Sequence, residues 1–219
     1  MVRRLFDEQS ALQAAEGVDF FLGETFTFLE EARQCLQAIK AAGYPAMITF
    51  AVRDAETAEA VPLAEAPRIL AGEGVDVIGA NCGRDPERIL PVVALMRRAT
   101  SGYVAAQPIG FRTRDGLPTF TQLPEFPLAL DSLTLSRAEM ATHATTARAL
   151  GVIGSCCGSV AHQVRAMAEA LGRRPPASAI SASVDRHPGI PKSRTLEEMA
   201  GAKPKSSDAP RFATGDRNW

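Results

Sequence analysis

Short apolar segments that alternate with amphipathic helices constrain the fold of this chain more than any other feature. The segments 18–23, 45–52, 74–79, 103–107 and 152–154 are mostly apolar, and a helical pattern comes after each one. A strand that is apolar on both faces is typical of a parallel sheet covered by helices. The sequence therefore predicts an α/β fold with about five parallel strands and covering helices.

The helices are indicated by their apolar periodicity and by the residues at their ends. Gly43 ends one helix, Asp85 and Pro86 begin another, and Ser136 caps a third. A long polar and proline-rich loop is expected over about 109–135. The predicted helices cover 4–16, 28–42, 63–73, 86–98, 136–150 and 159–171.

The spacing of these units favours a barrel over an open dinucleotide-binding sheet. No Gly-x-Gly-x-x-Gly motif follows a strand. A (β/α)8 barrel has eight strands, with its active site at their C-terminal ends, whereas this pattern supplies about five. We therefore predict a partial (β/α)8 TIM barrel over residues 1–177. Residues 178–219 are rich in Pro, Lys, Ser and Ala, and we expect a disordered or loosely packed tail there.

Composition and charge exclude several classes of function. The net charge is −1 and no basic stripe occurs, so nucleic acid is not an expected partner. No apolar run approaches the ~18–20 residues that span a bilayer, so no membrane association is expected. The first residues lack the apolar core of a signal peptide, and a cytoplasmic location is the default expectation.

Three of the four cysteines lie at the ends of two predicted strands. Cys82 follows one strand, and Cys156 and Cys157 follow another. Thiolates are soft ligands that select zinc, and three protein ligands leave the fourth position open, as in catalytic sites. A disulfide between adjacent cysteines is strained, and disulfides are rare in the cytosol. The pair therefore indicates metal binding or redox chemistry, provided that the three sulfurs meet.

Other polar residues have ordinary structural interpretations. Cys35 lies within a predicted helix near its apolar face, where we expect it to pack. His143, His162 and His187 show no metal-ligand spacing, and surface or packing roles are expected for the first two, which lie on predicted helices. Gln107 is interpreted as a group that satisfies a turn or the backbone.

Three motifs resemble those of the homocysteine S-methyltransferase family. They are Glu24-Thr25-Phe26, Gly79-Ala80-Asn81-Cys82 and Gly154-Ser155-Cys156-Cys157-Gly158, in the same order and spacing. The segments 103–108 and 123–127 are similar to those of the betaine-dependent subgroup in particular. The resemblance covers about residues 14–177 and implies that the five strands are the fourth to eighth of the barrel.

The resemblance implies a function and roles for individual residues. The implied reaction moves a methyl group from betaine or a similar donor to homocysteine and forms methionine. Cys82, Cys156 and Cys157 are the implied zinc ligands, and Glu24 would hold the ammonium group of the amino acid. Asn81 would contact the substrate or fix the loop. Zinc suits this chemistry because it deprotonates a bound thiol, which is otherwise mostly protonated at pH 7.

Several alternatives remain open at this point. Because early strands are missing, the chain is alternatively a non-catalytic barrel fragment, or half of a split barrel that a partner chain or an oligomer completes. A vicinal-dithiol redox or metal-binding protein is a further alternative. The methyl donor is also open between betaine, S-methylmethionine, dimethylsulfonium compounds and a folate–corrinoid donor.

Overall fold

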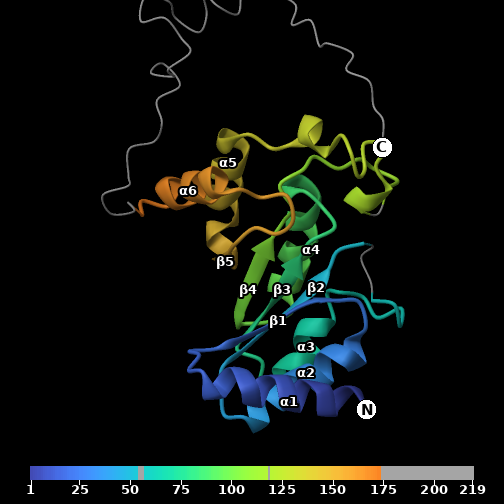
Figure 1. The fold of residues 1–219 in the computed structure, drawn as a ribbon, viewed down its shortest axis with the longest axis vertical. Coiled ribbons are helices and arrows are strands. Elements are labelled where there is room, and N and C mark those ends of the chain that lie inside the picture. The colour runs from blue at the N-terminus through green and yellow to red at the C-terminus, as the bar shows by residue number, and fades with distance from the viewer. Residues whose placement is uncertain (54–56, 118, 174–219) are drawn as a thin grey trace, which may run out of the picture. The chain divides into compact units, whose positions relative to one another are not determined.

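One sheet of five parallel strands forms the centre of the computed structural model, which describes residues 1–53, 57–117 and 119–173. The strands lie side by side in chain order, β1-β2-β3-β4-β5, and helices connect one strand to the next along the chain (Figure 1). The predicted parallel α/β sheet is therefore confirmed. The elements are α1 (Val2–Ala15), β1 (Phe21–Phe26), α2 (Leu29–Ala41), β2 (Ala46–Ala51), α3 (Ala66–Ala71), β3 (Val77–Asn81), α4 (Pro86–Arg98), β4 (Tyr103–Gln107), α5 (Arg137–Ala147), β5 (Gly151–Ile153) and α6 (Ala161–Ala170), with short 3-10 helices at Phe120–Gln122, Leu130–Leu133 and Arg148–Leu150.

The main core lies between the middle strands and the helices α2, α3 and α4. Ile48, Ile78 and Val104 occupy one row across β2, β3 and β4, and all three are buried. Leu36 of α2 and Ile89 of α4 belong to the same buried cluster. Burial of apolar side chains at alternate strand positions fixes the register, because a shift by one residue would turn these side chains to the other face.

The C-terminal part of the sheet is built more weakly. The strand β5 has only three residues, and none of them is fully buried. The helices α5 and α6 pack together around a small cluster of Leu135, Met140, Ala144 and Met167. Ile153 of β5 packs against both this cluster and the main core. It therefore connects the two apolar clusters.

Two strands begin three residues later than the sequence pattern predicts. The expected strand 18–23 is β1 at Phe21–Phe26, because Phe21 is where pairing with Ala46 begins. The expected strand 74–79 is β3 at Val77–Asn81, since Gly74 adopts a positive φ of 83° and Asp76 accepts a hydrogen bond from the Ala46 amide. Both shifts matter for function, because they place Glu24 and Asn81 inside strands.

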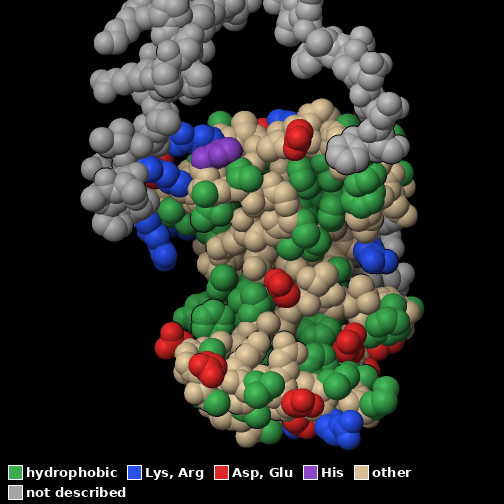
Figure 2. Space-filling model, viewed as in Figure 1, with side chains coloured by type: hydrophobic (Ala, Val, Ile, Leu, Met, Phe, Trp, Pro, Cys, Tyr) green, Lys and Arg blue, Asp and Glu red, His purple; other side chains and the backbone are tan. Residues whose placement is uncertain are grey.

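The edge of the sheet formed by β1, together with α1, exposes apolar side chains. Leu5 and Leu12 of α1 are 55% and 67% exposed, and Phe20 and Leu22 beside β1 are 55% and 40% exposed. Hydrophobic side chains are visible on the surface over the lower part of the molecule in Figure 2. Within the described ranges, β1 and β5 each pair on one side only. Unpaired edges and apolar surface of this kind are features that proteins normally cover.

The expected tail at 178–219 lies outside the described residues, and the boundary at residue 177 stays a prediction. Among the described residues, no helix is both long and apolar enough to cross a bilayer.

Candidate metal centre

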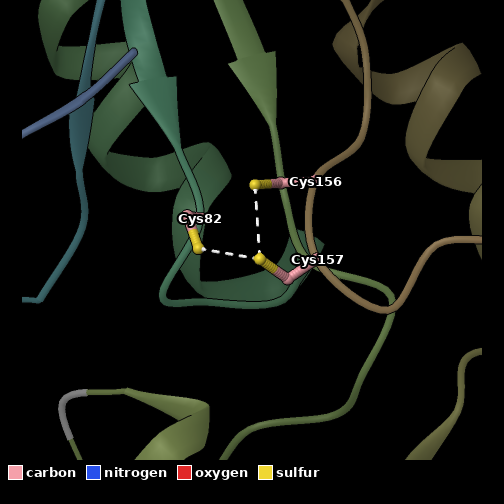
Figure 3. A group of neighbouring side chains, drawn as sticks. All are labelled: Cys82, Cys156 and Cys157. Atoms are coloured by element: carbon pink, nitrogen blue, oxygen red, sulfur yellow. Dashed lines mark hydrogen bonds between the residues drawn. The ribbon is translucent and has the colours of Figure 1, made fainter.

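Three cysteine side chains converge at the C-terminal ends of the strands. Cys82 directly follows β3, and Cys156 and Cys157 lie in the loop after β5. The Sγ atoms of Cys82 and Cys157 are 3.6 Å apart, and those of Cys156 and Cys157 are 3.8 Å apart (Figure 3). All three sulfurs lie within 4.8 Å of one another. The structure thus brings together residues that are 75 positions apart in the sequence.

A tight turn after β3 aims the Cys82 side chain at the other two cysteines. Cys82 adopts a left-handed backbone conformation with φ of 58°, which is uncommon for a residue other than glycine. Gly83 follows with φ of 75°, and a Cβ atom there would lie 2.4 Å from the Val52 carbonyl oxygen. Only glycine fits this position. Strained residues of this kind cluster at functional sites.

Backbone hydrogen bonds hold the double-cysteine loop against the segment after β4. The Cys156 amide donates to the Pro108 carbonyl at 2.7 Å, and the Gly110 amide donates to the Cys157 carbonyl at 2.8 Å. Gly158 has φ of 73°, and a Cβ there would overlap the Phe111 ring. The loop after β4 therefore fixes the position of two sulfurs, a role that the sequence pattern did not reveal.

The three thiols influence one another's protonation. Proton sharing with the Cys82 side chain lowers the pKa of Cys156 to about 6, and the Cys157 amide and the Asn81 side chain act in the same direction. The same interaction, together with burial, raises the pKa of Cys82, and burial raises that of Cys157. The interactions within the group thus favour the thiolate form of Cys156.

The spacing of the sulfurs fits a zinc ion. Zinc binds thiolates at about 2.3 Å in tetrahedral geometry, which holds two sulfurs about 3.8 Å apart. The two measured separations agree with that value. Cys82 and Cys156 are half-buried whereas Cys157 is exposed, so the group is accessible from solvent. Three soft ligands with access for a fourth suit a zinc site that binds another molecule.

Asn81 joins the cysteine group to β1. It is fully buried, its Oδ1 accepts a hydrogen bond from the Thr25 amide, and its Nδ2 donates to Thr25 Oγ1. Nδ2 also lies 3.8 Å from the sulfur of Cys156. Thr25 was not singled out from the sequence. The sequence signal for it was its membership of the motif Glu24-Thr25-Phe26, to which no role of Thr25 was attached.

Glu24 lies in the irregular part of β1 rather than after the strand. Pairing between β1 and β2 is interrupted between Gly23 and Phe26, and the Glu24 side chain is exposed. No hydrogen bond or ion pair within the described residues joins the Glu24 carboxylate to the cysteines. A chain of contacts through Thr25 and Asn81 still connects its backbone to Cys156.

The remaining sequence expectations can also be placed. Cys35 is buried in α2, where burial raises its pKa to about 11, which agrees with a packing role. His143 is buried in α5 and His162 is exposed on α6, while His187 lies outside the described residues. Gln107 is half-buried, and its carbonyl accepts a hydrogen bond from the Cys82 amide.

Comparison with known sequences gives a consistent assignment. The family model described as Homocysteine S-methyltransferase matches residues 1–171. The chain is 34% identical to mouse betaine–homocysteine S-methyltransferase 1, covering 81% of this chain and 46% of that protein. It is 32% identical to the S-methylmethionine–homocysteine S-methyltransferase BHMT2 of Pongo abelii, covering 81% of this chain and 52% of that protein. The chain thus spans about half the length of the curated relatives it matches.

Solved structures show the same fold. The apo form of the Escherichia coli homocysteine methyltransferase MmuM superposes with a TM-score of 0.55 at 18% identity, covering 77% of this chain and 57% of that one. The metallated form gives a TM-score of 0.57 at 18% identity, covering 75% and 51%. The predicted partial barrel is therefore confirmed as the fold class. By its sequence, the chain belongs to the homocysteine S-methyltransferase family.

Proposed function

We propose that this chain is part of a zinc-dependent S-methyltransferase that moves a methyl group from betaine or a similar donor to homocysteine and forms methionine. The observation that carries the proposal is the convergence of Cys82, Cys156 and Cys157 at the strand ends, with sulfur separations that suit zinc. Relatives named for homocysteine methylation and a neighbour solved in a metallated form support it.

In this proposal, the cysteines and Glu24 have separate roles. Cys82, Cys156 and Cys157 hold the metal, and zinc supplies the Lewis acidity that keeps the homocysteine sulfur deprotonated. The exposed Glu24 carboxylate binds the ammonium group of homocysteine by charge complementarity. Fixing both ends of the amino acid leaves its sulfur aligned for in-line attack on the donor methyl group.

The methyl donor stays part of the proposal. One relative is named for betaine and another for S-methylmethionine, and both match this chain at similar identity. Betaine is preferred because of the segments 103–108 and 123–127. An assay with each donor in turn, scored by methionine formation, separates the two.

We also propose that the barrel needs completion and that the protein is cytoplasmic. The exposed apolar side chains of α1 and the one-sided pairing of β1 favour an oligomer or partner chain at that edge. The alternative is a barrel fragment without activity.

The proposed cytoplasmic location is supported by the cysteines. All four cysteines are free, which suits a reducing compartment such as the cytoplasm.

The decisive test is zinc content together with methionine formation. Purified chain should bind one zinc per molecule, and homocysteine plus a donor should yield methionine, alone or with a completing chain. Less than half an equivalent of zinc after careful refolding would count against the metal centre. Full zinc without methionine, under both conditions, would favour the inactive fragment.

Replacing Glu24 by Gln tests the proposed contact with the substrate. The change removes one charge and keeps the shape, so zinc content should stay the same while homocysteine affinity falls by about 10-fold to 100-fold, equivalent to the ~1.5–3 kcal/mol of a charged hydrogen bond. Glu87→Gln is the matched control, because Glu87 is 87% exposed on α4. Equal affinity in both variants would remove Glu24 from the site.

A second candidate function is redox sensing by the double cysteine. The sulfurs of Cys156 and Cys157 already lie 3.8 Å apart, so an oxidant such as oxidised glutathione could couple them. This candidate predicts reversible disulfide formation at physiological potential and no effect of Glu24→Gln. Mass spectrometry after equilibration in glutathione buffers measures the outcome.

A further inference from the structure

The Asn81 side chain uses its polar atoms entirely within the protein. Its Oδ1 accepts from the Thr25 amide at 2.9 Å, and its Nδ2 donates to Thr25 Oγ1 at 2.7 Å. The Nδ2 group also faces the Cys156 sulfur at 3.8 Å. With 0% of the residue exposed, these bonds occupy both hydrogens of the amide and leave no open path to a substrate.

These contacts reach over an intervening strand. Asn81 belongs to β3, where it pairs with Ala51 of β2, while Thr25 belongs to β1 on the far side of β2. Thr25 lies where the pairing of β1 with β2 is interrupted, so its amide is bonded by Asn81 instead of by a neighbouring strand. The Asn81 side chain thus takes over the role of a sheet hydrogen bond.

Thr25 needs such support because its conformation is unfavourable. Its φ of 67° is left-handed, a region that β-branched residues rarely occupy. Strained conformations persist only where the surroundings fix them. Two hydrogen bonds from one side chain hold both the amide and the hydroxyl of Thr25. They therefore also constrain the backbone of the preceding residue, Glu24, within the irregular part of β1.

The opposite side of the same amide contacts the metal centre. The Asn81 Nδ2 group lies 3.8 Å from the Cys156 sulfur, which is within reach of a hydrogen bond to that sulfur. Asn81 also directly precedes Cys82 in the chain. One buried amide is therefore placed between the proposed ammonium-binding segment and the Cys156 sulfur, and its residue is the chain neighbour of Cys82.

We propose that Asn81 is a positioning residue that couples the Glu24–Thr25 segment to the cysteine group, instead of a residue that touches the substrate. The inference rests on the proposed function, because it assigns a purpose to the link between the two halves of that site. Its consequence is that binding of a metal by the cysteines rigidifies the segment that carries Glu24. Partners that orient metal ligands commonly contribute about 10-fold to 100-fold in metal affinity.

The test uses the full chain with zinc ions as the probe. Zinc affinity is measured by competition with a chromogenic chelator, and hydrogen exchange at the Thr25 amide is measured with and without zinc. Asn81→Ala should weaken zinc binding by about 10-fold to 100-fold. It should also speed exchange at Thr25 and abolish the extra protection that zinc gives in the unchanged chain. The sulfur-to-metal absorption band of the Co²⁺ form should shift as well.

Two substitutions of Thr25 and one control sharpen the result. Thr25→Val removes the hydroxyl without changing the shape and should give a smaller effect in the same direction. Thr25→Ser keeps the hydroxyl and should behave like the unchanged chain. Thr49→Val is the control, because the buried Thr49 hydroxyl has no hydrogen-bond partner among the described residues. It should leave zinc affinity and Thr25 exchange unaltered.

The outcomes are distinguishable. Unaltered zinc affinity and zinc-dependent protection in Asn81→Ala would overturn the coupling. If Asn81→Ala does not fold, Thr25→Val decides, since Thr25 is exposed and its hydroxyl lies outside the core. If the unchanged chain binds no zinc, the proposed function fails. Faster Thr25 exchange in Asn81→Ala than in the unchanged chain would then still support the link to β1, and equal exchange would overturn it.

Discussion

The middle strand β3 and the edge strand β5 lead to cysteines of the same group, but the two strands are packed differently. Four of the five residues of β3 are buried, and the strand is paired on both sides. The strand β5 has three residues, none fully buried, and is paired on one side within the described residues. Cys82 therefore follows a rigid strand, while Cys156 and Cys157 follow a weakly packed one.

This difference indicates how the site is held. The loop after β5 depends on backbone bonds to Pro108 and Gly110 and on the contact between Asn81 and Cys156. A metal that binds all three sulfurs would add a connection between the middle of the sheet and its edge. We therefore expect metal binding to stabilise the edge, while the middle stays folded without it.

The largest expected effect comes from removing the one ligand on the rigid side. Cys82→Ala should lower zinc affinity by at least ~1,000-fold, because thiolate-rich sites owe binding free energies of about 10–16 kcal/mol to only a few ligands. Chelator competition measures the change. Cys35→Ala is the matched control, since Cys35 is buried in α2 away from the group. Equal losses in both variants would show that folding, not ligation, is affected.

Core substitutions compare the two regions directly. Phe50→Ala in β2 should lower the free energy of unfolding by about 3–5 kcal/mol, because Phe50 is fully buried and a cavity remains. Val152→Ala in β5 should lower it by only about 1 kcal/mol, since Val152 is half-buried. Urea denaturation measures both values. A cost at Val152 that equals the cost at Phe50 would refute the contrast between middle and edge.

Hydrogen exchange should reveal the stabilisation of the edge by metal. The amides of Gly154 and Cys156 donate to the Ala106 and Pro108 carbonyls. With zinc at 100 times its dissociation constant, openings that release the metal become rarer by about 100-fold, and exchange at these amides should slow accordingly. Amides of α1, whose opening releases no ligand, should exchange as before. Uniform slowing across the chain would point to a global effect instead.

The smallest expected effect concerns thiol reactivity in zinc-free protein. Only the thiolate reacts with iodoacetamide, so alkylation of Cys156 should rise as the pH increases through about 6 and then level off. Cys157, whose pKa is raised, should continue to gain reactivity above pH ~8.5. Rates at neutral pH should differ little, because a lower pKa also reduces nucleophilicity. Peptide mapping at a series of pH values identifies the midpoint for each cysteine.

Much of the fold could be predicted from local patterns. The helix 86–98 and the strand 103–107 have the predicted bounds, because Asp85 and Pro86 begin the helix and the strand is apolar up to its last residue. The start of β1 could not be predicted in this way. Val18 and Phe20 are apolar and extend the strand pattern, but the partner strand provides no pairing before Phe21. Strand ends depend on the neighbour as well as on the chain itself.

The sequence by itself determined the order of strands and helices, the family, and the three cysteines as a candidate metal-binding set, because periodicity and motif spacing are local properties. Only the tertiary structure decided that the sulfurs lie within 4.8 Å of one another, that Asn81 connects Thr25 to Cys156, and that Glu24 lies in an interrupted strand. The physical reason is that distances between residues far apart in the chain depend on strand register, and register is fixed by packing across the whole sheet.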